Sequence, residues 1–277
     1  MKMNNSWLIV LIILFTNCRS FNKKIDVDNH GVNLIWDFSN EKKYVYSLAT
    51  SISSEFKTSK DSPLLKSTIV QSGNVLVKVK SNQLADFSIT DLKSEYKWFK
   101  KDGTLKDSSS VIIPTTTIKD IGQNGVFGES ETDMYFKLLM PLPSSKIHKG
   151  ETYKVPLKFS LDDYPKLFNK GFNTITFAKI KTIQGRKCAV LNGLFDISNL
   201  SNIKELEGHY SQKITGVATY YFDIGKHCFL GVDINILENS LNNLKIQKSK
   251  LPGAYYMLSR YVIKIRLNGI TDLLELS

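Results

Sequence analysis

The sequence is poor in cysteine, histidine and proline, and it lacks a long hydrophobic run. Its 277 residues include 3 Cys, 4 His and 7 Pro, which excludes a disulfide-dense miniprotein. The longest apolar run, Trp7–Phe15, has nine residues, far short of the ~20 that a permanent transmembrane helix needs. Because 42% of the residues are hydrophobic, the chain is not disordered either. These absences leave a packed globular protein that needs neither disulfides nor a metal for its stability.

Motifs of catalysis and of metal binding are also missing. The histidines are far apart in the sequence, and no His-Glu-x-x-His or Cys-x-x-Cys spacing occurs, so we expect no metal site. There is no Gly-x-Ser-x-Gly elbow, P-loop or Gly-x-Gly-x-x-Gly loop, so we expect no catalytic residues and no cofactor. The protein is therefore interpreted as a non-enzyme, with a hydrolase as the least favoured alternative.

The positive charge is spread along the chain. Lys and Arg number 37 against 26 Asp and Glu, a formal net charge of +11. A nucleic-acid partner would favour a concentrated basic stripe, so none is expected. Weak attraction to anionic lipid head groups is compatible with this distribution.

The N-terminal segment is typical of an export signal. Lys2 precedes the apolar run, and polar residues follow from Thr16 onward. A basic residue before an apolar run of this length is the pattern of a secretory signal peptide. We expect residues 1–17 to be removed after export.

The residues around Cys18 resemble the lipobox of bacterial lipoproteins, whose cysteine is acylated and becomes the new N-terminus. The resemblance implies lipidation of Cys18, a membrane partner through the lipid anchor and a polar tether over residues 18–33. Cleavage by the ordinary signal peptidase and an uncleaved membrane anchor are the alternatives. The resemblance implies a lipid-anchored protein of the bacterial cell envelope, at the outer membrane. An acidic cluster just after the cysteine marks surface-exported lipoproteins in some bacteria, and because none occurs here, we expect the protein to face the periplasm.

Through most of the chain, apolar and polar residues alternate. This period of two predicts antiparallel strands with one face on a core and the other in water. About eleven strands are predicted by this pattern. They are Tyr44–Phe56, Val75–Val79, Phe87–Leu92, Glu95–Lys101, Met134–Met140, Tyr153–Phe159, Phe172–Ile183, Lys187–Ile197, Lys213–Phe222, His227–Leu237 and Tyr255–Leu267.

Turn residues separate these strands, so strands that are adjacent in sequence should pair. Hairpin signals occur at Ser72-Gly73-Asn74, Asp102-Gly103, Gln184-Gly185 and Asp223-Ile224-Gly225. Helical signals are confined to Ser160–Asn169, which contains Pro165, and to Asn199–Leu206, with a weaker one at 239–248,.

The sequence thus predicts an all-β fold with one or two short helices. Several predicted strands have ten to thirteen residues, and such length favours a curved sheet or a half-open barrel. Paired prolines at Met140–Pro143 interrupt the strand pattern,. We therefore expect two β-rich lobes, at 34–140 and 141–277, or one continuous sheet that includes both.

The second half resembles a group of uncharacterised, β-rich envelope lipoproteins. The resemblance depends on four short pieces: Met140–Pro143, Lys149–Tyr153, Gly185–Ala189 and Tyr221–Gly225. It implies a β-rich envelope domain and supplies no catalytic residues.

Two cysteines remain if Cys18 is acylated. Cys188 and Cys228 both lie in predicted strands, and an oxidising compartment would permit a disulfide between them. The alternative is a pair of buried thiols that pack as small apolar residues.

Aromatic residues gather on the predicted strands, as at Tyr44 and Tyr46, Tyr96–Phe99, Tyr220–Phe222, and Tyr255, Tyr256 and Tyr261. They are interpreted as ordinary core or as the lining of a groove for an apolar ligand. The leading hypothesis is a non-catalytic binding module for a lipid, an acyl chain or an envelope protein partner. The alternative is a structural or assembly lipoprotein with no ligand pocket.

Overall fold

A computed structural model of the chain describes residues 31–125, 131–143, 145–161, 164–199, 208–244 and 255–272. The signal segment 1–17, Cys18 and the tether up to residue 30 lie outside the described residues. The described part contains eleven strands and the helix α3.

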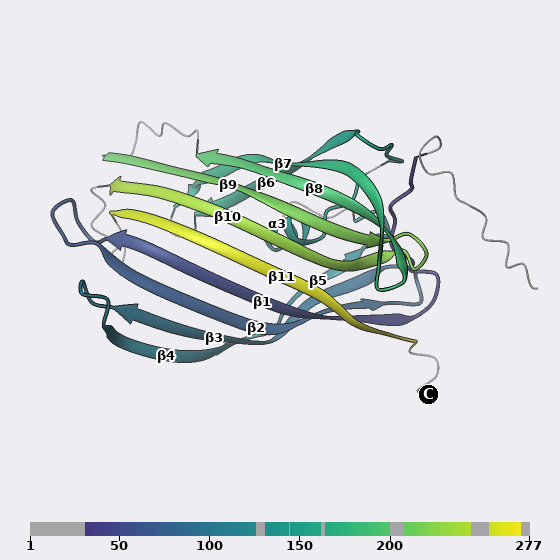
Figure 1. Cartoon of the computed structure of the whole chain (residues 1–277), viewed down its shortest axis with the longest axis horizontal. Helices are drawn as coiled ribbons and strands as arrows, with labels where there is room; N and C mark the ends of the chain where they lie inside the picture. Colours follow the sequence, from purple (N-terminus) through teal and green to yellow (C-terminus); the bar gives the residue numbers. More distant parts are fainter. Residues whose placement is uncertain are drawn as a thin grey trace, which may run out of the picture.

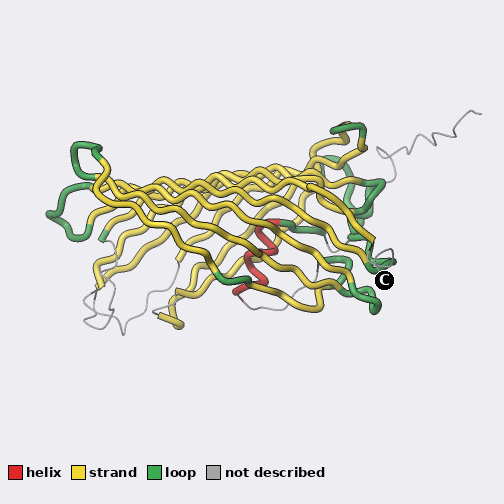
Figure 2. The backbone as a smooth tube through the Cα atoms, turned by 90° about the horizontal axis from the view of Figure 1, so that it is seen from below, coloured by secondary structure: helices red, strands yellow, loops and turns green. Residues whose placement is uncertain are grey.

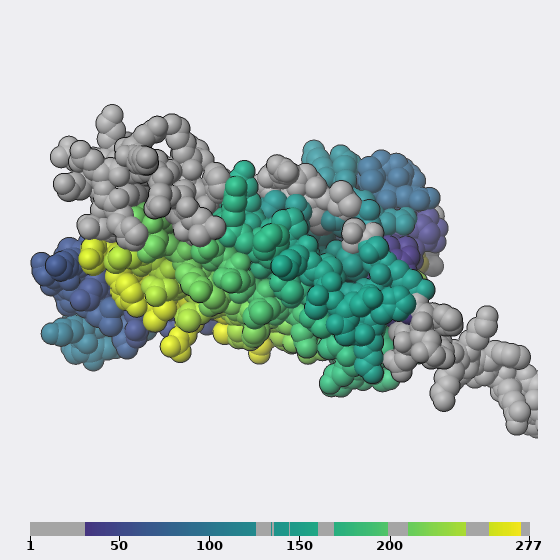
Figure 3. Space-filling model, turned by 90° about the horizontal axis from the view of Figure 1, so that it is seen from above, coloured from purple at the N-terminus to yellow at the C-terminus, as the bar shows by residue number. Residues whose placement is uncertain are grey.

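All of the strands join one antiparallel sheet (Figure 1). Its order is β4-β3-β2-β1-β11-β10-β9-β8-β7-β6, and β5 pairs with β3 beside β4. The bounds are β1 Lys42–Lys57, β2 Leu65–Val79, β3 Ala85–Phe99, β4 Leu105–Ile113, β5 Thr116–Ile121, α3 Glu131–Leu139, β6 Thr152–Leu161, β7 Tyr164–Ile183, β8 Arg186–Asn199, β9 Gly208–Asp223, β10 Cys228–Leu244 and β11 Tyr256–Asp272. In the space-filling view, the yellow, green and teal of β11 to β6 follow one another across the surface (Figure 3).

The sheet is curved and not closed, which confirms the predicted all-β, half-open architecture. Among the described strands, β4 and β6 stand at the two ends of the order and do not pair with each other. Figure 2 shows α3 inside the curve of the sheet. Pairing of β1 with β11 joins strands from the segments 34–140 and 141–277 in a single sheet.

Most of the predicted turns are confirmed. Two residues, Gln184 and Gly185, connect β7 to β8 with φ of 50° and 75°, as the primed turns of two-residue hairpins require. The prediction of a hairpin at Ser72-Gly73-Asn74 is wrong, because β2 continues through these residues and only its register with β3 shifts. A Cβ on Gly73 would lie 2.9 Å from the Thr90 carbonyl oxygen, so glycine allows the two backbones to approach at this bulge.

The helix predictions were wrong where the structure tests them. Residues 160–161 and 164–169 are strand, and β10 extends to Leu244 through the weak signal at 239–248. Asn199 ends β8, and the rest of Asn199–Leu206 lies outside the described residues. The helix instead occupies Glu131–Leu139, where a strand at Met134–Met140 was predicted.

One face of the sheet is buried along much of its length. On β1, Tyr44, Tyr46 and Leu48 are buried, whereas Ala49 and Ser51 on the opposite face are exposed. The buried, concave face holds α3 in place at several points. The Tyr220 hydroxyl on β9 donates to the Leu138 carbonyl at 2.8 Å, and the Phe136 ring lies edge-on to Phe87 of β3 with centroids 4.4 Å apart.

The segment before β1 packs against the end of the sheet where β1 begins. Val32 forms a bridge with Ile147, and Leu34, Trp36 and Phe38 are buried. Asp37 fixes this segment to β1, because its carboxylate lies 2.5 Å from the Lys42 ammonium. Partial burial raises the pKa of Asp37, but hydrogen bonds from Lys42 and Ser39 outweigh it and lower the pKa from 3.8 to about 2.

This ion pair predicts acid-dependent stability. Because the folded pKa is below the unfolded one, Asp37 stabilises the fold above about pH 4, and the stabilisation is lost as pH falls towards about 2. Asp37→Asn should lower the free energy of unfolding by about 1–2 kcal/mol at neutral pH, a value discounted because the carboxylate is a third exposed. At about pH 2 the variant and the wild type should be nearly equal, as measured by urea unfolding.

Asp61→Asn is the matched control, because Asp61 is exposed in the β1–β2 connection. It should change stability by less than about 0.5 kcal/mol at either pH. An Asp37→Asn deficit that is equally large at both pH values would contradict the assignment to this ion pair.

Candidate functional site

The concave face changes in character along the strands. On β1 the residues facing α3 run from Tyr44 and Tyr46 through Leu48 and Ile52 to Ser54. We call these three zones the aromatic end, the central cavity and the polar row. From Leu48 to Ser54 the strand rises about 20 Å.

The aromatic end is filled by side chains. The Trp36 ring lies 5.4 Å from Tyr44, 5.5 Å from Phe229 and 5.9 Å from Phe38, measured between centroids. Phe222 contacts Phe229 edge-on at 5.3 Å. All of these rings are buried, so this zone is core.

The central cavity has a volume of about 460 Å³. It lies on the concave face between the first five strands, β11 and the C-terminal turn of α3. Its lining is mainly apolar: Leu48, Thr50, Ile52, Gln71, Phe87, Ile89, Leu92, Ile113, Thr116, Ile118, Leu138, Leu139, Tyr261 and Ile263. Apolar pockets of about 300–1,000 Å³ with a few polar groups are typical of sites for small ligands.

Incomplete coverage of the sheet leaves this cavity open. Ile52, Ile89 and Ile263 point to the concave face but are only partly buried. One of its few polar side chains, Gln71, donates from Nε2 to the Ser94 hydroxyl at 3.2 Å. A ligand that removed these isoleucines from water would be stabilised by the hydrophobic effect.

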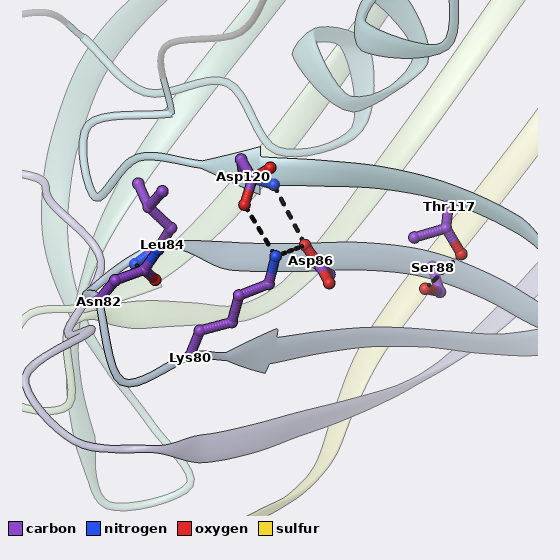
Figure 4. Close-up of polar contacts among 7 residues, drawn as sticks. All are labelled: Lys80, Asn82, Leu84, Asp86, Ser88, Thr117 and Asp120. Carbon is purple, nitrogen blue, oxygen red and sulfur yellow. Dashed lines mark hydrogen bonds and ion pairs between the residues drawn. The ribbon is translucent and has the colours of Figure 1, made fainter.

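A polar contact holds β5 beside the cavity (Figure 4). The Lys80 ammonium lies 2.7 Å from Asp86 of β3 and 2.8 Å from Asp120 of β5. The Asp120 amide also donates to Asp86 at 3.1 Å. Burial raises the pKa of Asp86, but the hydrogen bond with Lys80 and the contacts with its other partners lower it by more. The pKa of Asp86 therefore lies below its ordinary value. These contacts position Thr116 and Ile118 in the cavity wall.

A second groove of about 540 Å³ lies at the β6 side of α3. It is lined by Met134, Lys137, Pro156, Leu157, Lys158, Lys170, Gly171, Phe172, Asp196 and Ser198. A Cβ on Gly171 would lie 2.0 Å from the Asp196 carbonyl oxygen, so only glycine permits the close approach of β7 to β8 here. The charged rim makes this groove less apolar than the central cavity.

The polar row crosses four strands. Ser67, Ser54, Ser259 and Glu238 follow one another in register on β2, β1, β11 and β10, and all four are buried. The hydroxyls of Ser54 and Ser259 lie 2.7 Å apart. The Glu238 carboxylate accepts hydrogen bonds from the Tyr261 hydroxyl and the Gln212 amide. Sequence reasoning missed this row, whose only signal is a run of polar residues at core-facing positions.

The predicted aromatic sites divide between core and cavity. Tyr44, Tyr46 and Tyr220 are fully buried core, whereas Tyr261 lines the central cavity. Phe56 and Trp98 form an edge-on pair with centroids 5.7 Å apart, and Trp98 is exposed.

Cys188 and Cys228 are buried, free thiols. In the strand register, Asp223 of β9 lies opposite Cys188 of β8 on one side and opposite Cys228 of β10 on the other. The Cα atoms of the two cysteines are therefore two strand spacings apart, about 9–10 Å. Disulfides join Cα atoms about 4.4–6.8 Å apart, so the geometry favours the alternative of two buried thiols. Burial, together with the charge of Asp223, raises the pKa of Cys188 to about 11 and that of Cys228 to about 12.

In the described part of the chain, no three His, Cys, Asp or Glu side chains converge as metal ligands. Among the same residues, no helix is sufficiently long and apolar to span a bilayer. Cys18 lies outside the described residues.

Similarity to known proteins is found with solved structures. No protein-family model and no curated protein sequence matches the chain. A lipovitellin structure concerned with lipid–protein interactions superposes with a TM-score of 0.49 at 12% identity over 85% of this chain and 26% of that one. This chain therefore spans about a quarter of lipovitellin's length.

Two bacterial structures also match, each at 10% identity and a TM-score of 0.15, over 84% of this chain and 87% of the other. One is a domain assigned to outer membrane lipoprotein sorting from Vibrio parahaemolyticus, and the other is a DUF1329 family protein from Desulfovibrio piger ATCC 29098. Likeness at this level says nothing about ligand, activity or location.

The thiol geometry predicts the redox state of the two cysteines. A Cys18→Ser protein that is unfolded without reductant should expose two titratable thiols. The native protein should react slowly with a thiol reagent, because both thiols are buried and protonated. Ellman titration before and after unfolding measures both. The absence of free thiols after unfolding would contradict this assignment and support a disulfide between Cys188 and Cys228.

Proposed function

We propose that this protein is a non-catalytic, membrane-tethered lipoprotein that binds an acyl chain on the concave face of its sheet. The central cavity carries the proposal, because partly buried isoleucines surround an unfilled apolar space. Each methylene group moved from water into such a space contributes about 0.8 kcal/mol. A hydrocarbon chain is therefore the ligand that this lining favours most.

The position of the polar groups supports a lipid in particular. The cavity is bounded by core at the aromatic end and adjoins the polar row at the other, where Tyr261 joins the two by lining the cavity and donating to Glu238. A ligand with an apolar tail and a polar head matches this order of surfaces. The alternative, an assembly lipoprotein with no pocket, does not account for the cavity.

The anchor and the location rest on the sequence. A signal-like segment ends shortly before Cys18, and acyl chains on that residue would hold the protein at a membrane. The net charge of +11 favours a surface rich in anionic lipids. The proposal is thus a protein of the bacterial cell envelope, at the outer membrane and facing the periplasm, with a lipid or an envelope protein as its partner.

Filling the cavity should weaken binding. In Ile89→Trp the larger side chain occupies the space between β3 and α3, so the affinity for lauryl alcohol should fall roughly tenfold or more, since a change of about 1.4 kcal/mol suffices. Isothermal titration below the solubility limit of the alcohol measures it. Val70→Trp is the matched control, because Val70 lies on the exposed face of β2, and it should bind as the wild type does. Loss of binding in both variants would argue against the cavity as the site.

The anchor predicts covalent acylation at one residue. Metabolic labelling with palmitate should mark the wild type and leave Cys18→Ser unmarked, because no other cysteine adjoins the export segment. Membrane fractionation of the same cells should show the variant released. An unlabelled wild-type protein of full mature length would contradict the tether and leave the cavity proposal standing.

A further inference from the structure

Glu238 is a buried carboxylate on the concave face, next to the central cavity. Its residue is 8% exposed, and it lies on β10 in register with Ser259 of β11. Tyr261, two residues further along β11, lines the cavity and donates its hydroxyl to the carboxylate. The carboxylate therefore stands where the apolar surface ends.

The hydrogen-bond partners of Glu238 in the described part of the chain are neutral. Gln212 donates to it, and the Gln212 carbonyl in turn accepts from Asn169 and from the Tyr210 hydroxyl, the latter at 2.8 Å. Burial, and then the charge of Glu238, raise the pKa of Tyr210 well above its ordinary value, so this phenol remains a donor. Within the described residues, no lysine, arginine or histidine forms an ion pair with Glu238.

The cluster leaves one buried acceptor without a donor. Asn169 is 3% exposed, its amide nitrogen bonds Gln212, and its carbonyl oxygen has no hydrogen-bond partner. A buried, unpartnered acceptor beside a buried carboxylate is costly unless a donor arrives. A primary ammonium carries three donors and a positive charge, so it would supply a donor for the unpartnered acceptor and a counter-charge for the carboxylate.

We propose that the Glu238 cluster binds the ammonium head of an amine-bearing lipid whose hydrocarbon chain lies in the central cavity. This inference rests on the proposed function, since it assigns the head group at the same site. The carboxylate forms a charge-assisted hydrogen bond with the ammonium, and Tyr261 and Gln212 orient the carboxylate towards the cavity.

A chain-matched series separates the head group from the tail. Laurylamine, lauryl alcohol and laurate share one hydrocarbon chain. Their affinities for the wild-type protein are measured by calorimetry at neutral pH, below the micelle concentration or the solubility limit of each compound. The amine should bind roughly tenfold more tightly than the alcohol, because hydrogen bonds to charged groups exceed neutral ones. Laurate should bind more weakly than the alcohol, since its charge repels the carboxylate.

Glu238→Gln should remove the preference for the amine and leave the alcohol affinity within about twofold, because the side chain keeps its shape and loses its charge. Glu95→Gln is the matched control. It changes the net charge equally, but Glu95 is exposed on β3 and paired with Lys93, so the preference should persist. The source of the ammonium group is then tested by comparing the affinities of lauroyl lysophosphatidylethanolamine and lauroyl lysophosphatidylglycerol. Tighter binding of the ethanolamine lipid identifies a phospholipid head group. A preference that is seen with laurylamine alone identifies an amine lipid without phosphate.

The outcomes distinguish the two proposals. Equal affinities of the wild type for laurylamine and lauryl alcohol would overturn the head-group assignment, whether or not Glu238→Gln folds, and would leave acyl binding intact. Failure of all three compounds to bind would overturn the proposed function itself.

Discussion

A mismatch in length between strands and helix governs this structure. A strand of 17 residues such as β10 extends about 56 Å, whereas the nine residues of α3 extend about 14 Å. Within the described residues, a helix of this length cannot cover the concave face of strands such as β7, with 20 residues, and β10, with 17. The aromatic side chains and the segment 32–38 fill one end, and the remaining apolar surface forms the wall of the central cavity.

The sheet tolerates this incomplete filling because its stability lies elsewhere. Tyr220 and Phe87 attach α3 to both sides of the curve, and Lys80 ties β5 to β3. The side chains that line the cavity are thus held by strand pairing, by these contacts and by the core cluster against which they pack. A preformed apolar site of this kind binds without first having to order its own lining.

The sequence predicted the sheet well and the site poorly, for physical reasons. Alternation with a period of two and glycine turns are local signals, so the strands and hairpins could be read directly. The helix was missed because Met134, Phe136, Leu138 and Met140 also alternate, although Pro141 and the basic Lys137 in the last turn are signals for a helix end. Ser160–Asn169 was mistaken for a helix, since pairing of β6 with β7 overrides its local propensity,.

The cavity and the Glu238 cluster could not be predicted from single residues. Each depends on which strands become neighbours, and the pairing of β1 with β11 is a long-range property. Glu238 itself is a polar residue at a core-facing position of a strand, which is the kind of local conflict that marks a functional position. The register, absent from the sequence pattern, brings it next to Tyr261.

The pairing of β1 with β11 also shapes how the chain reaches this state. Ser47 and Arg266 meet across 219 residues of sequence, so the first long strand acquires its second neighbour only when nearly the whole polypeptide is present. Until then β1 has an open hydrogen-bonding edge, a liability for aggregation. Completing the sheet by pairing strands from the two ends of the chain is a long-range step, and such steps are intrinsically slow.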